Sequence, residues 1–386
     1  MNLYYTTAQN DFRHEVRTWL AEHLSASPLE SFDTEQGFEQ HRDWERTLHT
    51  GNYGMVTWPK EYGGRGCDLI EWLIFEEEYY GADAPGRVSQ NGIFLLAPTM
   101  MEYGTEEQKA RYLPAMAQGD EIWAQAWSEP GAGSDMAAIR TKADRQGDNY
   151  VINGQKIWSS RAVFADWCFG LFRTDPDVER PHQGLSMILV PLDSPGITVR
   201  PIRQLDGDPG FAEIFFDDVQ VPVANLLGPE HQGWGVAMAT AGFERGLMLR
   251  SPARFQKTAE RLINLMRSQD GRVSSATRAA VVQAWMDAEA YCYSTYATAS
   301  KLMSGGSVGP ETSCNKIFWS ELDKSMQRAA VSLSGAYSEL EQDLDRNLEA
   351  ARWTDGYMFS LAGGIYAGSN EIQRNIISER VLGLPR

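Results

Sequence analysis

Residues 126–135 read AWSEPGAGSD, and this stretch decides how the rest of the chain is interpreted. Gly131 and Gly133 leave room for a ligand to touch the backbone, and Pro130 prevents a helix from running through the segment. Two hydroxyl and two carboxylate side chains surround these residues. A rigid polar loop with accessible N–H groups is typical of segments that hold a flat, polar ligand with several rings. We therefore expect residues 126–135 to contribute to a ligand site.

Two later stretches have a similar polar, glycine-containing character. Residues 153–160 read NGQKIWSS, which predicts a turn followed by a strand that ends in a tryptophan and two hydroxyl side chains. Residues 365–374 read IYAGSNEIQR and lie near the C-terminus. Together with residues 126–135, these stretches predict three walls of one flavin site.

Composition limits the class of protein. The chain has 386 residues, 42% of them hydrophobic and 23% charged, which predicts two or three globular domains with a large core. The net charge of −17 argues against nucleic acid or an anionic membrane as a partner. The four scattered cysteines predict reduced, buried thiols and no metal site. Neither a secretion signal nor an apolar run of about 18 residues is visible, so we expect a cytoplasmic protein.

The first part of the chain is predicted to be helical and the middle part to be strands. Residues 8–122 show helical spacing of apolar side chains, interrupted by a loop at 58–66. Thr105 and Gln108 form a capping-box pattern, which predicts a helix that runs to about Met116. Short alternating runs then indicate an antiparallel sandwich or barrel. The expected strands are 122–128, 138–144, 150–152, 167–173, 185–191, 197–202 and 212–219.

Helices return in the last part of the chain. We expect one long helix over 234–266 despite Pro252, then helices over 275–303 and 312–337, an acidic linker, and a final helix over 370–381. Aromatic residues in this part are expected in the core or at a subunit interface. They are Trp285, Tyr291, Tyr293, Phe318 and Trp319.

The order of helices, strands and helices predicts an α+β fold. The predicted domains are 1–120, 121–230 and 231–386. Because helices and strands are segregated, a doubly wound sheet is disfavoured. Neither a G-x-G-x-x-G after a strand nor a G-x-x-x-x-G-K-[ST] motif is present, so neither a dinucleotide fold nor a P-loop is supported.

Several blocks in the right order resemble the acyl-CoA dehydrogenase family of flavoproteins, and the resemblance covers nearly the whole chain. It implies an N-terminal helical domain, a middle β-domain and a C-terminal four-helix bundle. It also implies FAD as cofactor and an acyl-CoA thioester as substrate. The blocks are 58–66, 104–114, 126–135, 153–160, 215–222, 232–234 and 365–383.

The resemblance implies roles for individual residues. It implies that Ser134 lies near the substrate as well as near the flavin, and that Tyr366 lines the acyl pocket. For Trp158, a place in the core of the β-domain remains an alternative. The residues implied to contact the flavin are Trp127, Ser128, Gly133, Ser134, Trp158, Ser159, Ser160, Ser369 and Glu371.

The reaction of the family needs a base for the Cα proton and hydrogen bonds to the thioester oxygen. In many members the base is a Glu in the C-terminal loop, but this chain has Ala367 there. Other members carry the base on the first helix of the C-terminal domain, where this chain has Glu244 followed by Arg245. We expect Glu244 to be the base and Arg245 to contact CoA; a solvated helix charge is the alternative for Glu244. Ala367 can still donate its backbone N–H.

Two further departures concern FAD and assembly. Residues 267–272 lack the R-x-x-F-G motif that receives the adenosine diphosphate of FAD from a neighbouring subunit, and Ser334 replaces the first glycine of a usual Gly-Gly pair. These losses resemble a subgroup of mixed α2β2 tetramers in which one chain type lacks part of the flavin site. The complete 126–135 and 153–160 blocks make this chain similar to the flavin-holding type.

The resulting hypothesis is FAD-dependent oxidation of an acyl-CoA to the trans-2-enoyl-CoA, with electrons passed to an electron-transfer flavoprotein. The first alternative is a flavin oxidase or monooxygenase on the same fold. The second is a subunit that needs a partner chain for activity. The class of acyl chain and the choice between a homotetramer and an α2β2 heterotetramer stay open.

Overall fold

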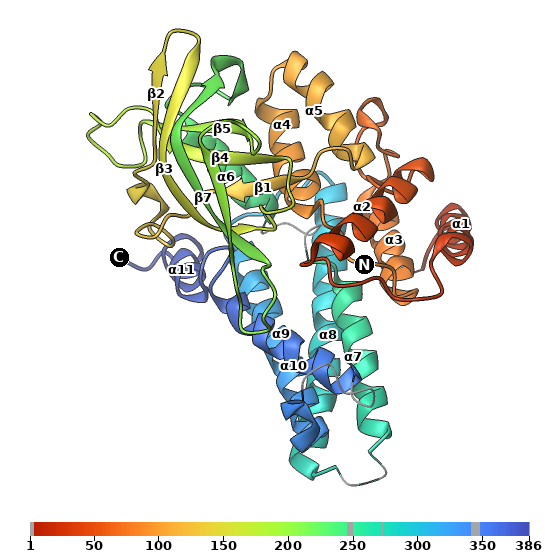
Figure 1. The fold of residues 1–386 in the computed structure, drawn as a ribbon. Helices are drawn as coiled ribbons and strands as arrows, with labels where there is room; N and C mark the ends of the chain where they lie inside the picture. The colour runs from red at the N-terminus through yellow and green to blue at the C-terminus, as the bar shows by residue number, and fades with distance from the viewer. Residues whose placement is uncertain (1–3, 245–249, 270, 272, 341–347, 386) are drawn as a thin grey trace. The chain divides into compact units, whose positions relative to one another are not determined.

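The computed structural model describes residues 4–244, 250–269, 271, 273–340 and 348–385 (Figure 1). The chain divides into two compact units. The helical unit combines Met1–Glu22, Asp68–Ala84 and Arg245–Arg386. The sheet unit combines His23–Cys67 and Pro85–Glu244. The N-terminal helices are therefore shared between the two units.

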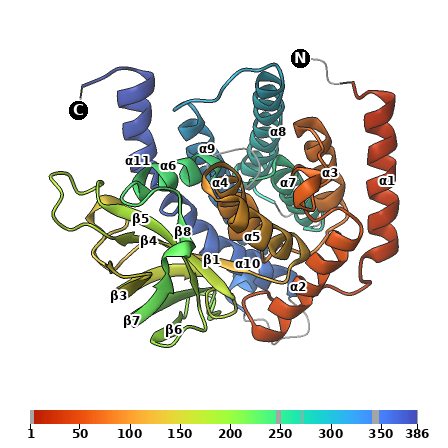
Figure 2. The same ribbon diagram turned by 90° about the horizontal axis from the view of Figure 1, so that it is seen from above.

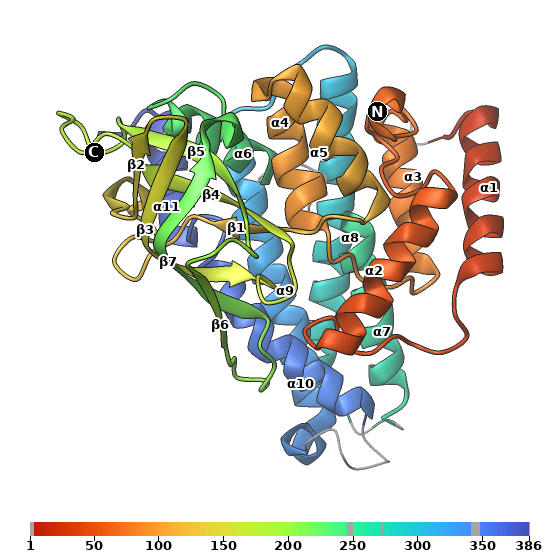
Figure 3. The same ribbon diagram turned by 45° about the horizontal axis from the view of Figure 1, so that its top comes forward.

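The sheet unit contains eight strands among its described residues, in the order β6-β7-β3-β2-β4-β5-β8, with β1 beside β4. Most neighbouring strands are antiparallel. The exceptions are β1, which pairs with β4 in parallel, and one residue of β2, which also pairs with β4 in parallel. Figure 2 shows β4 beside β5, and Figure 3 shows the long pair β3 and β7. The predicted α+β class is confirmed. The strands are β1 (Trp123–Ala126), β2 (Lys142–Gln146), β3 (Asn149–Ser160), β4 (Trp167–Arg173), β5 (Leu185–Pro191), β6 (Ile197–Ile202), β7 (Phe211–Pro222) and β8 (Leu226–Leu227).

The predicted turn at the start of 153–160 is wrong, because Asn153 and Gly154 lie inside β3. The pairing of β3 with β7 shifts register between Ile152 and Gly154, which marks a β-bulge. Gly154 has φ +144, and a Cβ atom there would lie 2.7 Å from the Thr141 side chain. The extra residue of this bulge lies on β7, so the glycine is explained by its positive φ and by the close approach of Thr141.

Apolar side chains on alternate positions of β3 and β7 point into the core of the sheet unit. Tyr150 and Ile152 on β3 are fully buried, as are Ala212 and Ile214 on β7. β5 is buried on both faces over 185–190, and helix α6 (Gly233–Glu244) packs against it. The remaining α-helices of this unit are α2 (Glu35–Thr50), α4 (Ala97–Tyr103) and α5 (Glu106–Gln118).

The predicted capping box at the start of α5 is confirmed. The Thr105 hydroxyl accepts the N–H of Gln108 at 3.2 Å, and the Gln108 side chain accepts the N–H of Thr105 at 3.1 Å. These two bonds satisfy N–H groups that the first turn of a helix leaves without partners. The helix ends at Gln118, two residues beyond the predicted Met116.

The helical unit is built on a bundle in which α7, α8, α9 and α10 pack together (Figure 1). Its core includes Phe255, Leu262, Met326 and Trp353, all buried. This confirms the predicted helical C-terminal part. The helices of this unit are α1 (Thr7–His23), α3 (Leu69–Gly81), α7 (Pro252–Arg267), α8 (Ser275–Met303), α9 (Thr312–Ser334), α10 (Leu348–Ser360) and α11 (Asn370–Ile376).

Two predictions for the C-terminal helices are wrong. The expected long helix over 234–266 is two helices, and Pro252 lies in the first turn of α7. Proline is favourable there because the N–H groups of a first turn have no partner inside the helix. The expected acidic linker contains α10, whose Ala351 and Trp353 are buried. The acidic residues before α10 obscured its apolar positions in the sequence.

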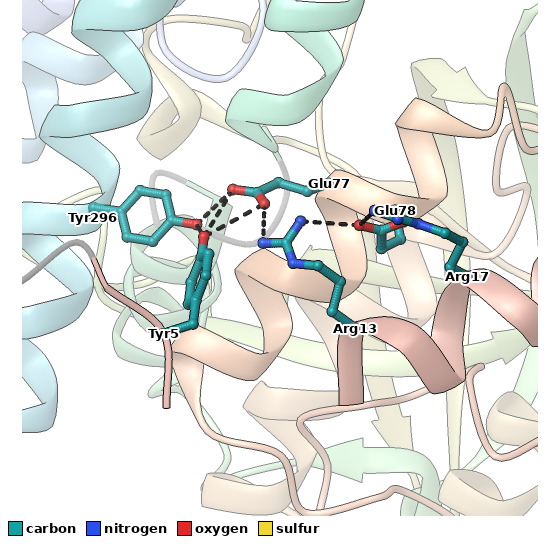
Figure 4. Close-up of polar contacts among 6 residues, drawn as sticks. All are labelled: Tyr5, Arg13, Arg17, Glu77, Glu78 and Tyr296. Atoms are coloured by element: carbon teal, nitrogen blue, oxygen red, sulfur yellow. Dashed lines mark hydrogen bonds and ion pairs between the residues drawn. The ribbon is translucent and has the colours of Figure 1, made fainter. Parts of the chain in front are cut away.

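A polar cluster attaches the N-terminal segment to the rest of the helical unit (Figure 4). The Tyr5 and Tyr296 hydroxyls lie 2.5 Å apart, and Tyr296 donates to the Glu77 carboxylate at 2.5 Å. Arg13 forms ion pairs with Glu77 at 2.6 Å and with Glu78 at 2.9 Å. Burial raises the pKa of Tyr5 and Tyr296, so both hydroxyls keep their protons at neutral pH.

The prediction of buried cysteines holds for some residues only, and the aromatic residues divide between the core and the surface, where a subunit interface stays a prediction. Tyr291 and Trp319 are buried, whereas Trp285, Tyr293 and Phe318 are exposed by 38–49%. All four cysteines are free; two of them, Cys168 and Cys292, are buried, but Cys67 is half-buried and Cys314 is exposed. Within the described ranges, no helix is both long and apolar enough to cross a membrane.

Candidate cofactor and substrate site

The loop after β1 is a tight turn with accessible backbone. Glu129 and Ala132 exchange backbone hydrogen bonds of 2.9 and 3.0 Å, which closes the turn around Pro130 and Gly131. Gly131 and Gly133 are exposed, and a Cβ atom on either would meet no other atom within 4 Å. Crowding inside the protein therefore does not explain these glycines. The two glycines are instead explained by the open space that they leave for a ligand against the backbone.

A buried lysine on β3 fixes this loop. The Lys156 side chain is fully buried, and its Nζ lies 2.8 Å from Glu129 Oε1. Lys156 also donates to the carbonyls of Trp127 at 3.2 Å and Leu171 at 2.6 Å. One ammonium group thus joins the end of β1, the loop and β4. Lys156 carries no signal of this role in the sequence, because its partners lie far away along the chain.

The electrostatics of the pair keep Glu129 ionised. Burial opposes ionisation, but the charge of Lys156 and the N–H groups of Arg140 and Thr141 hold the pKa of Glu129 below its usual value. Burial disfavours the charged form of Lys156 as well, and for a lysine this lowers the pKa, to about 8. The carboxylate accepts three hydrogen bonds with lengths of 2.7–2.9 Å.

Residues 158–160 present an exposed ring and a buried hydroxyl. Trp158 has φ +63 and is 56% exposed, so the alternative of a core tryptophan is wrong. A left-handed conformation costs a non-glycine residue about 1–2 kcal/mol, and such strain is concentrated at functional sites. The strand places Trp158 in a second register shift between β3 and β7. Ser159 is buried next to it, and Ser160 is half-buried.

The structure brings residues 126–135 and 153–160 together, and their geometry fits a flavin. The N–H of Ile157 donates to the Ser128 carbonyl at 2.9 Å, which joins the two stretches. Trp127 Nε1 and Ser159 Oγ are buried without a hydrogen-bond partner among the described residues. Buried polar atoms of this kind require an explanation, and the ring nitrogens and carbonyls of a flavin would supply partners.

The C-terminal loop belongs to the helical unit and begins α11. Ala367 and Gly368 have φ values of +56 and +74. The Ser369 hydroxyl accepts the N–H of Ile372 at 3.3 Å and caps α11. Glu371 is exposed in the first turn, where its own N–H and the Ser369 hydroxyl hold its pKa below the usual value.

Tyr366 lies in an aromatic wall that includes a cation. Its ring stacks on Trp319 with centroids 5.9 Å apart, and Phe359 lies 6.4 Å away. The Arg250 guanidinium lies 4.8 Å from the Trp319 ring and 5.7 Å from the Tyr366 ring. Arg250 could not be singled out from the sequence, because no motif contains it. Trp319 is buried in the core of the bundle, and the half-buried Tyr366 packs against that core.

The predicted base lies partly outside the described residues. Glu244 is the last residue of α6, but its side chain is outside the described part, and so is Arg245 entirely. Their roles therefore stay predictions.

Comparisons with known proteins agree with one family over the whole chain. The models "Acyl-CoA dehydrogenase, N-terminal domain", "middle domain" and "C-terminal domain" match residues 6–120, 124–219 and 231–382. The acyl-CoA dehydrogenase IpdE1 of Mycolicibacterium smegmatis is 40% identical, with 97% of this chain and 98% of the relative covered. Its Mycobacterium tuberculosis counterpart is 39% identical with the same coverage.

Solved structures give the same result. The Tcur3481-Tcur3483 steroid ACAD is 27% identical and superposes with a TM-score of 0.86 over 100% of both chains. The ChsE4-ChsE5 complex from Mycobacterium tuberculosis is 31% identical and superposes with a TM-score of 0.83, also over 100% of both chains.

Proposed function

Because the chain belongs to the acyl-CoA dehydrogenase family and is an FAD-dependent oxidoreductase that acts on acyl-CoA, we propose that it forms the trans-2-enoyl-CoA and passes electrons to an electron-transfer flavoprotein. The observation that carries the proposal is the backbone of Ala367. In the described part of the chain, nothing accepts its N–H, which supports the proposal because this N–H stays available to donate to the thioester oxygen. We place the reaction in the cytoplasm, where the free cysteines would stay reduced.

The proposed division of labour starts with the cofactor. FAD, when bound, would supply the acceptor for the hydride that leaves Cβ of the substrate. Trp127 and Ser159 supply buried polar atoms that have no partner among the described residues, and Trp158 supplies an exposed flat ring. The proposed FAD-binding residues are Trp127, Ser128, Gly133, Ser134, Trp158, Ser159, Ser160, Ser369 and Glu371.

We assign proton transfer to Glu244. The methyl group of Ala367 cannot accept a proton, so this loop position does not supply the base. Glu244 removes the proton from Cα, and the Ala367 N–H donates to the thioester oxygen as that oxygen gains charge. Arg245 binds the CoA part of the substrate. Ser134 and Tyr366 contact the substrate.

For the acyl group we propose a ring-containing chain. One solved relative is named a steroid ACAD, and it is 27% identical to this chain. The half-buried rings of Tyr366 and Phe359, 6.4 Å apart, support the same class, since aromatic faces pack well against fused rings.

For the assembly we propose an α2β2 tetramer with a second, related chain. Two solved relatives are named as pairs of proteins, Tcur3481-Tcur3483 and ChsE4-ChsE5. The loss of the R-x-x-F-G motif in 267–272 supports a partner chain that completes FAD binding. A homotetramer is the competing arrangement.

The test is an anaerobic titration of the holoenzyme with straight, branched, aromatic, dicarboxylic and polycyclic acyl-CoAs. The flavin absorbance in the visible region is followed for each compound. Bleaching by the polycyclic class supports the full proposal, and bleaching by another class corrects only the acyl group. Bound flavin that no compound bleaches would overturn dehydrogenation. Rapid reoxidation by air would favour an oxidase, and a chain purified without flavin would favour a partner-dependent subunit.

A further inference from the structure

The C-terminal loop holds two consecutive residues in the left-handed region. Ala367 has φ +56 and Gly368 has φ +74. Glycine adopts this conformation freely, but alanine does so only when its surroundings impose it. A group close to Ala367 must therefore hold the backbone in place.

Gln373 is that group. Its side chain is fully buried on α11, and Nε2 donates to the carbonyls of Ala367 at 3.2 Å and Gly368 at 3.3 Å. These two bonds fix the peptide groups on either side of Gly368. On the other side of Ala367, the N–H of Tyr366 donates to the Ala362 carbonyl at 3.1 Å. The direction of the Ala367 N–H is thereby restricted from both sides.

Buried groups on α9 hold the ends of the same loop. Lys316 donates to the Gly363 carbonyl at 2.8 Å and to Asn370 Oδ1 at 2.9 Å. Asn370 in turn donates to Glu321 at 2.9 Å. With both ends fixed by Lys316, the conformation of the middle depends on Gln373.

The amide of Gln373 is used as a donor only. Its Oε1 is buried and has no hydrogen-bond partner among the described residues. A side chain that only filled space would not need to be a donor, and a buried acceptor without a partner is unfavourable. The two bonds to Ala367 and Gly368 are the contribution that explains a glutamine here.

We propose that Gln373 is a positioning residue that aims the Ala367 N–H at the thioester oxygen; this rests on the proposed function of that N–H. Gln373 itself touches neither substrate nor cofactor in this proposal. Loss of its two donors lets the loop turn, and a displaced donor lowers the rate of proton removal more than it weakens substrate binding.

The first variant is Gln373→Met, which keeps the length and removes both donors. In the holoenzyme we expect kcat to fall about 10–10²-fold while KM changes little. The infrared C=O stretch of a bound ¹³C-labelled acyl thioester should move back toward its value in water. Gln327→Met is the matched control, because the buried oxygen of Gln327 also has no partner in the described ranges, but its amide nitrogen donates to Asp323 on its own helix.

A second variant separates positioning from packing. Gln373→Glu keeps the shape, but an ionised carboxylate cannot donate, whereas the protonated form donates one hydrogen bond. We expect its kcat, relative to wild type, to recover as pH falls, and a space-filling role would give no such profile. Wild-type kcat and C=O stretch in both variants, or equal losses in Gln327→Met, would overturn the inference. Failure of the proposed function would show differently, as a wild-type enzyme that no acyl-CoA reduces.

Discussion

Two buried lysines hold the two loops proposed to bind cofactor and substrate, and they do so differently. Lys156 in the sheet unit pairs directly with the Glu129 carboxylate at 2.8 Å. Lys316 in the helical unit donates to a carbonyl and to the Asn370 amide oxygen, and Asn370 then bonds to Glu321. The first loop is therefore held by a buried ion pair, and the second by a hydrogen-bond chain.

This difference predicts that removal of the two lysines lowers the free energy of unfolding by unequal amounts. Removing one partner of a buried ion pair leaves an uncompensated charge and costs about 3–5 kcal/mol. Removing a hydrogen-bond donor that is charged costs about 1.5–3 kcal/mol. Both lysines hold loops, and neither is proposed to transfer a proton.

The largest expected effect lies in neither loop. Glu244→Gln should retain FAD and lower turnover by about 10²–10⁴-fold, the usual contribution of a general base. Steady-state kinetics and the flavin content of the purified variant measure both quantities. Glu260→Gln, which changes a mostly exposed carboxylate on α7, is the control. Near-normal turnover in Glu244→Gln would remove Glu244 from the mechanism.

Lys156→Met should lower the free energy of unfolding by about 3–5 kcal/mol and weaken FAD retention. The cause is the Glu129 carboxylate left buried without its cation. Urea unfolding and the release of FAD on dilution measure the two effects. The double variant Lys156→Met/Glu129→Leu should be more stable than the single one, because no lone charge remains. A double variant as unstable as Lys156→Met would mean that the pair is not what holds the loop.

Lys316→Met should cost about 1.5–3 kcal/mol and leave more FAD bound than Lys156→Met does. Its main effect should be on kcat, because the loop that contains Ala367 loses the anchor at both ends. Arg328→Met on the same helix is the control, since the Arg328 side chain is exposed and such surface substitutions usually change stability by less than about 0.5 kcal/mol. Equal FAD loss in the Lys156 and Lys316 variants would contradict the prediction that the two loops contribute unequally to FAD retention.

Acid titration tests the ion pair without removing Lys156. The pKa of Glu129 is lower in the folded chain than in the unfolded chain. Its contribution to stability is therefore fully present above the ordinary pKa of a glutamate and is lost as pH falls through the folded value. Urea midpoints measured from neutral pH downward should show this loss in wild type, and Glu129→Gln should lack it. Identical acid profiles for the two proteins would contradict the assignment.

The sequence predicted the elements whose signal is local. The bounds of β4, β5 and β6 agree with the prediction because apolar runs are separated there by breaking residues. The start of α5 was predicted because a capping box needs only residues three positions apart. Asn153 and Gly154 misled because this dipeptide usually indicates a turn, whereas pairing with β7 keeps it inside a strand.

The groups that hold the candidate site could not be predicted in this way. Lys156 and Glu129 are 27 residues apart, and Lys316 and Asn370 are 54 residues apart. A lysine in a strand or helix looks like a surface residue until its distant partner is known. Gln373 is only six residues from Ala367, but its role depends on a left-handed backbone that the alanine does not signal.

The smallest expected effect concerns the left-handed backbone of Ala367. Ala367→Gly should raise the free energy of unfolding by about 0.5–1 kcal/mol, because relief of a left-handed alanine exceeds the entropy that glycine adds to the unfolded chain. Ala280→Gly on the exposed side of α8 is the control and should lower stability by about 0.5–1 kcal/mol. Opposite signs in the two urea experiments would show that residue 367 is held in a strained conformation. A loss of stability in both variants would mean that the backbone of residue 367 is not strained.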